Sequence, residues 1–191
     1  RVIFFDEKGN QVPAEFAAGL IMLDELRKTP NSQFIFSINT SRGIREYLAE
    51  QGAKIRISRV GYAFVRSAMK KYKAAIGTET SGHYYFREAH FDDCALMALL
   101  KIAQILSRTH RPFSELILPF KRYYSKGELN FTIKKKEQLL SRVKKNYRGK
   151  GAVSFLDGIT VENKDWWFNI RPSNTEPITR LVLEARNQKL Y

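Results

Sequence analysis

Hydrophobic and polar positions follow two different patterns along this chain. Over the first two thirds, short apolar runs typical of buried strands alternate with segments whose apolar residues recur every three or four positions, as in amphipathic helices. Further on, strand-like segments follow one another with a single helical pattern among them. We expect strands at 2–5, 34–38, 54–58, 128–133, 152–155, 159–162, 166–170 and 178–185, and helices at 13–28, 41–51, 62–72, 94–107 and in the lysine-rich stretch after 134.

The two patterns predict two architectures in succession. Alternating strands and helices predict an α/β layered domain, a mixed sheet with flanking helices, over residues 11–118. Pro112 and Pro119 mark the exit from this domain. One basic helix among several strands then predicts an α+β domain with an antiparallel sheet over residues 119–191.

A few local features refine these elements. Asp92 or Asp93 is expected to cap the helix that follows, a role preferred here over a metal pair. Cys94 lies in an apolar run, so we expect a buried thiol and not a nucleophile. Alternation places Trp166 and Trp167 on opposite faces of a strand, so at least one of them should belong to the core.

The chain is strongly basic, with 33 Lys and Arg against 19 Asp and Glu and a net charge of +14. Most of the excess lies in residues 101–150, which hold 14 Lys and Arg against three Glu. Such a patch is compatible with nucleic acid. However, Leu139, Leu140 and Val143 recur among the lysines at helical spacing, which favours the solvated face of an amphipathic helix. No zinc-finger or aromatic RNA-binding pattern accompanies the charge, so nucleic acid is not the expected partner, and the role of the basic 121–150 segment stays open.

Composition also bears on location. The single cysteine excludes an intrachain disulfide framework and fits a reducing compartment. No apolar stretch is long enough to span a membrane, and no signal peptide is visible. We therefore expect a cytoplasmic protein without a membrane partner, and the sequence leaves its oligomeric state open.

Two loops carry candidate chemistry. The segment 77–83, Gly-Thr-Glu-Thr-Ser-Gly-His, reads as a glycine-bounded loop between two strands. Its Glu79 can accept hydrogen bonds from neighbouring sugar hydroxyls, and Ser81 can donate or accept. Taken alone, the segment is better explained as a hairpin whose Glu and Ser side chains are merely solvated.

The second loop is 171–177, Arg-Pro-Ser-Asn-Thr-Glu-Pro, again between two strand-like segments. It combines a guanidinium, two hydroxyls, an amide and backbone N–H groups, which together suit the oxygens of a phosphate ester. Arg180 can bring a second guanidinium to the same place. The alternative is an ordinary polar turn, because Ser, Asn and Pro are common turn residues.

Taken together, the motifs are more specific. The loop at 77–83, then Phe-Asp-Asp at 91–93, Leu-Asp-Gly-Ile at 156–159 and the loop at 171–177, in this order, resemble the α-D-phosphohexomutases. Within that superfamily the chain is most similar to the bacterial phosphomannomutase/phosphoglucomutase group, from its first residue to about 186. The resemblance implies that 1–10 is a remnant of the family's metal-loop domain 2, 11–118 its sugar-recognising domain 3 and 119–191 its phosphate-binding domain 4.

The resemblance also assigns roles. It implies that Glu79 and Ser81 read sugar hydroxyls, and that Tyr62 and His83 are candidates for further substrate contacts. The residues implied to grip the phosphate that is not reacting are Arg171, Ser173, Asn174 and Thr175, with Arg180 in support.

The same resemblance implies a mutase that interconverts hexose 1-phosphates and hexose 6-phosphates through a phosphoserine and a bisphosphate intermediate. It aligns Arg1 with the end of an aspartate-rich Mg²⁺ loop. The serine and the metal ligands are therefore expected upstream of Arg1, with no catalytic or metal-binding residue in this chain, which should be inactive alone. The alternatives are a stand-alone module that binds sugar phosphates and a basic nucleic-acid-binding domain.

Several positions depart from the family pattern. Tyr62 stands where many relatives have His, and Asn39 where they have Lys. Because both positions contact substrate in those relatives, the choice among mannose, glucose and an amino sugar stays open. Asn174 favours the mannose/glucose group, since glucosamine-phosphate mutases usually carry Gly there.

Overall fold

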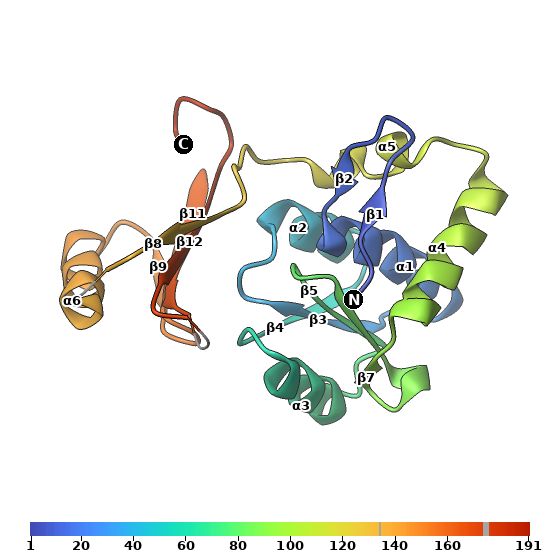
Figure 1. The fold of residues 1–191 in the computed structure, drawn as a ribbon, viewed down its shortest axis with the longest axis horizontal. Helices are drawn as coiled ribbons and strands as arrows, with labels where there is room; N and C mark the ends of the chain where they lie inside the picture. Colours follow the sequence, from blue (N-terminus) through green and yellow to red (C-terminus); the bar gives the residue numbers. More distant parts are fainter. Residues whose placement is uncertain (134, 174–175) are drawn as a thin grey trace. The chain divides into compact units, whose positions relative to one another are not determined.

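Two separate five-stranded sheets organise the chain, one in each of two units (Figure 1). The computed structural model describes residues 1–133, 135–173 and 176–191. The first unit comprises Arg1–Arg122 and the second Tyr123–Tyr191. The sequence pattern placed the change of architecture at residue 118, four residues before the end of the first unit.

The first unit contains both parallel and antiparallel strands. Its elements are β1 (Phe4–Phe5), β2 (Gln11–Val12), α1 (Ala14–Lys28), β3 (Gln33–Ser37), α2 (Arg42–Glu50), β4 (Lys54–Ser58), α3 (Tyr62–Tyr72), β5 (Ile76–Glu79), β6 (His83–Phe86), η1 (Arg87–Ala89), β7 (Asp92–Asp93), α4 (Ala95–Thr109), α5 (Phe113–Leu116) and η2 (Leu118–Phe120). Strand order is β4-β3-β5-β6-β7. Strand β3 pairs in parallel with β4 and β5, whereas β5–β6 and β6–β7 are antiparallel. The predicted mixed sheet is confirmed.

Helices cover both faces of this sheet. On one face, Phe34, Phe36 and Ile76 pack into a large apolar core with residues of α1, α2 and α4. On the other face, Ile35 and Tyr85 pack against α3. Successive residues of a strand point to opposite faces, so a sheet that is buried on both sides sends them alternately into the two cores. The first unit is therefore a three-layer α/β structure.

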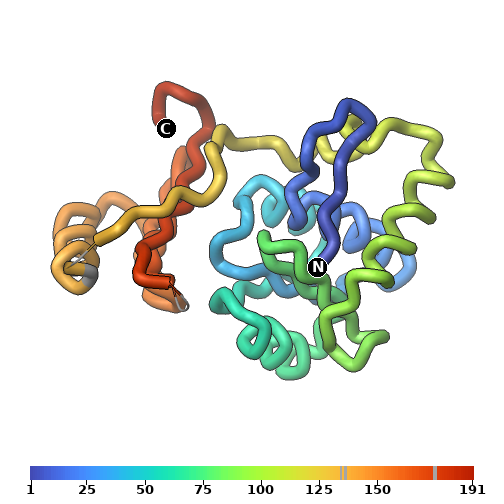
Figure 2. The backbone as a smooth tube through the Cα atoms, in the orientation of Figure 1, coloured from blue at the N-terminus to red at the C-terminus, as the bar shows by residue number. Residues whose placement is uncertain are grey.

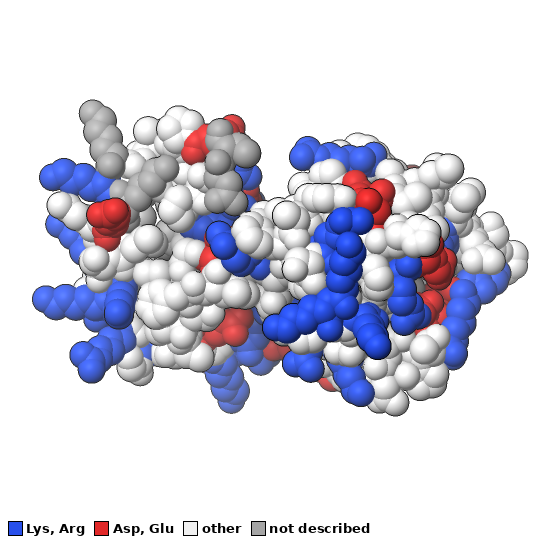
Figure 3. All heavy atoms as spheres, turned by 90° about the horizontal axis from the view of Figure 1, so that it is seen from below, with Lys and Arg blue, Asp and Glu red and all other residues white. Residues whose placement is uncertain are grey.

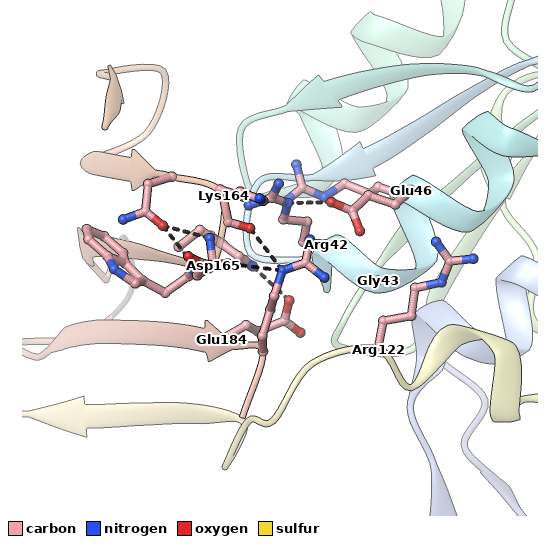
Figure 4. Close-up of polar contacts among 12 residues, drawn as sticks. Arg42, Gly43, Glu46, Arg122, Lys164, Asp165 and Glu184 are labelled. Atoms are coloured by element: carbon pink, nitrogen blue, oxygen red, sulfur yellow. Dashed lines mark hydrogen bonds and ion pairs between the residues drawn. The ribbon is translucent and has the colours of Figure 1, made fainter. Parts of the chain in front are cut away.

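Helix α2 begins at a capped and closely packed corner. Ser41 Oγ accepts a hydrogen bond from Gly43 N–H at 3.2 Å, and Arg42 forms an ion pair with Glu46 one turn later at 2.6 Å (Figure 4). A Cβ on Gly43 would lie 2.4 Å from the carbonyl oxygen of Phe120. Glycine at this position thus allows the backbone of η2 to pass directly over the start of the helix.

The second unit is a sheet with one helix. Its elements are β8 (Glu128–Phe131), α6 (Lys136–Asn146), β9 (Ala152–Ser154), β10 (Ile159–Glu162), β11 (Trp166–Pro172) and β12 (Thr179–Ala185). All strand pairs are antiparallel, in the order β8-β12-β11-β10-β9. The apolar stripe of α6 packs on β10 and β11, as its helical spacing predicted. The predicted α+β domain with an antiparallel sheet is confirmed.

The tryptophan pair follows the expected alternation. Trp167 is fully buried and its indole N–H donates to Glu184 at 2.7 Å. Trp166 lies on the opposite face, where its ring stacks on Phe168 with centroids 5.8 Å apart. The turn between β10 and β11, where Figure 4 labels Asp165, is held by Asn163, whose side-chain oxygen accepts from the backbone N–H groups of residues 165 and 166.

One local expectation was wrong. Asp92 and Asp93 do not cap α4; they form strand β7, and the N-cap residue of α4 is Cys94, without a side-chain hydrogen bond. Cys94 is partly buried and packs against the core of the first unit, so the expected buried thiol is confirmed in part. The pairing of β7 with β6 moves both carboxylates towards polar partners on neighbouring elements, which makes them part of the site described below.

Basic side chains are spread widely over the surface. Lys and Arg cover more of the face shown in Figure 3 than Asp and Glu do. Among the described helices, none is both long and apolar enough to cross a bilayer.

Candidate functional site

A buried carboxylate ends the central strand of the first unit. Glu79, the last residue of β5, is only 5% exposed. One carboxylate oxygen accepts from the backbone N–H of Gly61 at 2.7 Å and the other from the Tyr85 hydroxyl at 2.6 Å. Gly61 is the N-cap residue of α3, so the positive end of the helix dipole also stabilises the anion. Two hydrogen bonds therefore fix the carboxylate at the C-terminal end of this central strand.

Tyr85 supplies the second half of this arrangement. Burial, together with the hydrogen bond to Glu79, raises the pKa of Tyr85 far above its usual range. The phenol therefore stays protonated and keeps donating. Because a carboxylate offers about four acceptor positions, Glu79 retains roughly two for other donors.

The turn after β5 presents Ser81 at its tip. Thr80 accepts a hydrogen bond from the Asn39 side chain at 2.9 Å, which ties one side of the turn to the end of β3. Gly82 has a left-handed backbone (φ 84°), and a Cβ there would lie 2.9 Å from the carbonyl oxygen of Val2. The N-terminal segment thus runs beside the turn, as the backbone trace also shows (Figure 2). Ser81 itself is exposed.

His83 lies in a hydrogen-bonded chain of three side chains. Its Nδ1 is 2.5 Å from Asp93 Oδ2, and its Nε2 accepts from Arg1 Nε at 2.9 Å. The other oxygen of Asp93 accepts from the backbone N–H of Tyr84. Asp93 thus fixes the ring orientation and favours the tautomer with the proton on Nδ1, leaving Nε2 as an acceptor.

Tyr62 opens helix α3 and is held by the other aspartate. Its hydroxyl donates to Asp92 Oδ1 at 2.7 Å. That hydrogen bond raises the pKa of Tyr62 and lowers the pKa of Asp92. The Tyr62 ring also lies 5.8 Å from the Tyr85 ring, centroid to centroid.

The structure therefore brings Tyr62, Glu79 and His83 together around Tyr85. The His83 and Tyr85 rings are 6.4 Å apart. Sequence reasoning missed Tyr85 and misassigned both aspartates. The alternation of side chains along a strand could have indicated Tyr85, because it lies two residues after His83 and therefore on the same face of β6.

A second polar cluster lies in the second unit, on β11 and β12. Arg171 and Arg180 are directly opposite each other in the register of these strands. Two cations so placed repel each other, and Glu128 on β8 lies between them. Its Oε2 accepts from Arg171 Nη2 at 3.0 Å and its Oε1 from Arg180 Nη1 at 2.8 Å. Glu176 forms a further ion pair with Arg180.

Glu128, Arg171 and Arg180 are called the arginine cluster below. Arg171 is 4% exposed, whereas the side chain of Arg180 is 25% exposed. Burial by itself lowers the pKa of Arg180, but the hydrogen bonds and charges of Glu128 and Glu176 outweigh it and raise that pKa. The guanidinium of Arg180 therefore stays cationic.

The arginine cluster holds unused donors. Arg171 Nε and Arg180 Nε are buried and have no hydrogen-bond partner within the described part of the chain. Buried polar groups are normally satisfied, and leaving one unpaired costs about 1–3 kcal/mol. An anion with several acceptor oxygens is a ligand that would satisfy them.

The loop that leaves β11 is closed at its base. Ser173 N–H donates to the carbonyl of Ile178 at 2.9 Å, and Ser173 Oγ accepts from Glu176 N–H at 3.2 Å. Asn174 and Thr175, predicted as phosphate-binding residues, lie outside the described residues. Sequence reasoning grouped Arg171 with Arg180 but missed Glu128, because nothing in the sequence showed that β8 would pair with β12.

A three-layer α/β unit followed by an antiparallel sheet with one helix defines a two-domain α/β protein with a polar cluster in each unit. Residues 9–123 match the family described as phosphoglucomutase/phosphomannomutase, alpha/beta/alpha domain III. Residues 128–190 match the phosphoglucomutase/phosphomannomutase C-terminal domain. The chain belongs to the phosphoglucomutase/phosphomannomutase family.

Individual relatives agree with this assignment. The chain is 32% identical to a phosphomannomutase of Methanocaldococcus jannaschii over 189 residues, which is 99% of the chain and 42% of the relative. A crystal structure of a family protein from Burkholderia thailandensis superposes with a TM-score of 0.87 at 24% identity, covering 100% of this chain and 41% of that one.

A more distant structure has the same fold. An Aspergillus fumigatus N-acetylphosphoglucosamine mutase in complex with glucose 1,6-bisphosphate gives a TM-score of 0.68 at 13% identity, covering 98% of this chain and 43% of that one. The chain thus spans about two fifths of the length of the relatives that it matches.

Proposed function

We propose that this chain supplies substrate recognition in a phosphohexomutase that interconverts hexose 1-phosphates and hexose 6-phosphates. The observation that carries the proposal is the arginine cluster, in which the buried Nε atoms of Arg171 and Arg180 keep N–H donors that no described residue uses. Family membership supplies the reaction class. In this proposal each unit contributes one part of recognition.

The arginine cluster would hold the phosphate that is not reacting. A phosphate ester carries about two negative charges and three terminal oxygens, so it can accept from Arg171 Nε and Arg180 Nε together. Ser173, Asn174 and Thr175 add donors from the loop between the same strands. Such a clamp recognises a phosphate without regard to the carbon that bears it. That property suits a mutase, whose bisphosphate intermediate must be held in two orientations.

The polar cluster around Tyr85 would recognise the sugar through hydrogen bonds to its hydroxyl groups. Glu79 is fixed by two hydrogen bonds and retains acceptor positions for hydroxyl donors. Ser81 is exposed beside it, and Tyr62 and His83 are the further contacts that we propose. Because Asp93 holds the His83 proton on Nδ1, the Nε2 atom is an acceptor; a sugar hydroxyl would take the place of Arg1 Nε, which donates to it in the ligand-free chain. These contacts would decide which carbon is presented for phosphoryl transfer.

Phosphohexomutase chemistry in this proposal includes a Mg²⁺ ion and a phosphorylated serine. Among the residues that the structure describes, no three His, Cys, Asp or Glu side chains are grouped so that they could hold a metal ion. The roles that we propose for this chain are binding and orientation. We further propose that these 191 residues bind sugar phosphates without turning them over, and that the whole protein acts in the cytoplasm.

Kinetics of the whole protein test the proposal. Replacing Arg171 by Ala removes a charge-assisted phosphate contact, and we expect kcat/KM for a hexose 1-phosphate to fall by about 30- to 1,000-fold, equivalent to about 2–4 kcal/mol. Arg186→Ala is the matched control, because Arg186 is half-exposed and paired with Asp165. Unchanged kinetics in the Arg171→Ala protein would contradict the proposed role.

A further inference from the structure

The second unit contains a cavity that the proposed function does not use. It has a volume of about 610 Å³, and its lining includes Lys144, Lys145, Arg148, Val153 and Phe155. None of the three residues of the arginine cluster is among the described residues that line it. Helix α6 forms one side, and the edge strand β9 with the residue that follows it forms the other.

The sequence of α6 explains why cations face this cavity. Lining positions 141, 144, 145 and 148 are spaced i, i+3, i+4 and i+7, so they form one stripe along the helix and the turn that ends it. The apolar stripe of α6 packs on the sheet instead. The basic segment was expected to be only a solvated helix face; part of it lines a concave surface.

The turn after α6 fixes the position of this cationic stripe. Gly149 lines the cavity with a left-handed backbone (φ 79°). A Cβ on Gly151 would lie 2.4 Å from the carbonyl oxygen of Glu162, so the turn lies directly against β10. Only glycine allows that approach, and Arg148 in this turn is part of the cavity lining.

The lining is cationic on one side and apolar on the other. Lys144, Lys145 and Arg148 have no ion-pair partner in the described ranges of the chain, and the described lining includes no carboxylate. Phe155 is 57% exposed and Val153 is 37% exposed. Lys144 Nζ lies 5.3 Å from the centre of the Phe155 ring. A ligand that complements this surface is anionic at one end and flat and apolar at the other.

We propose that this cavity binds a free nucleotide. The phosphate groups contact Lys145 and Arg148, and the base packs on Phe155 and Val153, as bases stack on exposed aromatic rings. The volume lies in the range of about 300–1,000 Å³ that is typical of small-molecule sites. A hexose phosphate would match the charge but would leave the apolar side unused. A single RNA strand shares the chemistry, but it requires an extended groove, whereas this cavity is of single-ligand size.

Titration calorimetry of the 191-residue chain with adenosine diphosphate tests the proposal. We expect a Kd below about 1 mM. The double variant K145Q/R148Q should weaken binding at least about tenfold, because it removes two charge-assisted phosphate contacts. The control K164Q/K189Q removes the same charge from exposed positions of the same unit and should change the Kd by less than about twofold.

A third variant separates the two halves of the site. Phe155→Ala should weaken adenosine diphosphate about fivefold or more, in line with the stacking energy per base, while leaving inorganic pyrophosphate unaffected. Arg171→Ala should leave the Kd for adenosine diphosphate unchanged, since the arginine cluster is not involved.

Any of four results would overturn the proposal. The first is no heat of binding with adenosine diphosphate. The second is an equal loss in the two double variants, which would indicate unspecific attraction. The third is a single-stranded oligoadenylate that binds far more tightly than adenosine diphosphate, which would make the surface a nucleic-acid site. Loss of binding in Arg171→Ala would instead assign adenosine diphosphate to the arginine cluster and would equally contradict a separate site.

Discussion

At the scale of single residues, the arginine cluster is defined by a carboxylate that the sequence did not single out. Glu128 is the anion shared by two opposed guanidiniums, and Arg171 is almost completely buried. A buried cation without a counter-charge is strongly destabilising. Glu128 therefore keeps the pair of arginines together while no phosphate is bound.

Replacing Glu128 by Gln tests this balance. Gln keeps an oxygen acceptor but removes the charge, so we expect the ligand-free protein to lose about 1–3 kcal/mol of stability. A hexose phosphate should restore part of it, giving a larger ligand-induced rise in Tm than in the unmodified chain. Thermal melting with and without glucose 1-phosphate measures both effects, with Glu137→Gln on exposed α6 as control. Identical melting curves for the Glu128→Gln and unmodified chains would contradict the role.

Single residues also show what the sequence could not predict about the site. Glu79 and Ser81 were found because the motif marks them, and Arg180 because it follows the loop. Tyr85, Asp92 and Asp93 join the site through strand pairing and through side chains that meet across elements. Asp92 and Asp93 looked like helix caps because Asp is a favoured capping residue. Their pairing in β7 overrode that local preference.

At the scale of elements, the helices of the first unit are joined by an ionic contact. Asp24 on α1 pairs with Arg108 on α4 at 2.8 Å and with Lys28 one turn along α1 at 2.7 Å. Burial by itself raises the pKa of Asp24, but the hydrogen bonds and charges of Lys28 and Arg108 outweigh it and lower the pKa. The folded state thus holds the ionised form more strongly than the unfolded chain does.

This linkage predicts a pH dependence of stability. Because the folded pKa of Asp24 is depressed, its contribution is fully present above the unfolded pKa and is lost as pH falls through the folded pKa, from about pH 5 downwards. Asp24→Asn should therefore lower stability at pH 7 but lose less stability than the unmodified chain between about pH 5 and pH 2. Urea unfolding at a series of pH values measures this. Parallel pH profiles would contradict it.

The elements themselves followed from the sequence where local patterns dominate. Strand Lys54–Ser58 and helix Tyr62–Tyr72 match the expected ranges residue for residue, since alternation and helical spacing are strong there. The two-residue strands β1, β2 and β7 have no such pattern. Of these, only β1 falls within an expected strand; β2 and β7 were not expected. They exist because neighbouring backbone is placed beside them, which is information that a single segment does not contain.

At the scale of the whole molecule, two units each carry one polar cluster, and the fold classes of both were predictable from hydrophobic periodicity. The mixed sheet and the antiparallel sheet were expected, and both were observed. Strand order was not predictable, and strand order is what joins Glu128 to the two arginines. The basic segment likewise could not be read as a cavity until α6 and β9 were placed.

The central claim is that the arginine cluster binds the phosphate of a hexose phosphate. Titration calorimetry of this chain and of its Arg171→Ala variant with glucose 1,6-bisphosphate tests it most directly. The account predicts binding by the unmodified chain, without turnover, and an affinity at least about tenfold lower in the variant, as the loss of a charge-assisted phosphate contact requires. Equal affinity in the two proteins would contradict the claim.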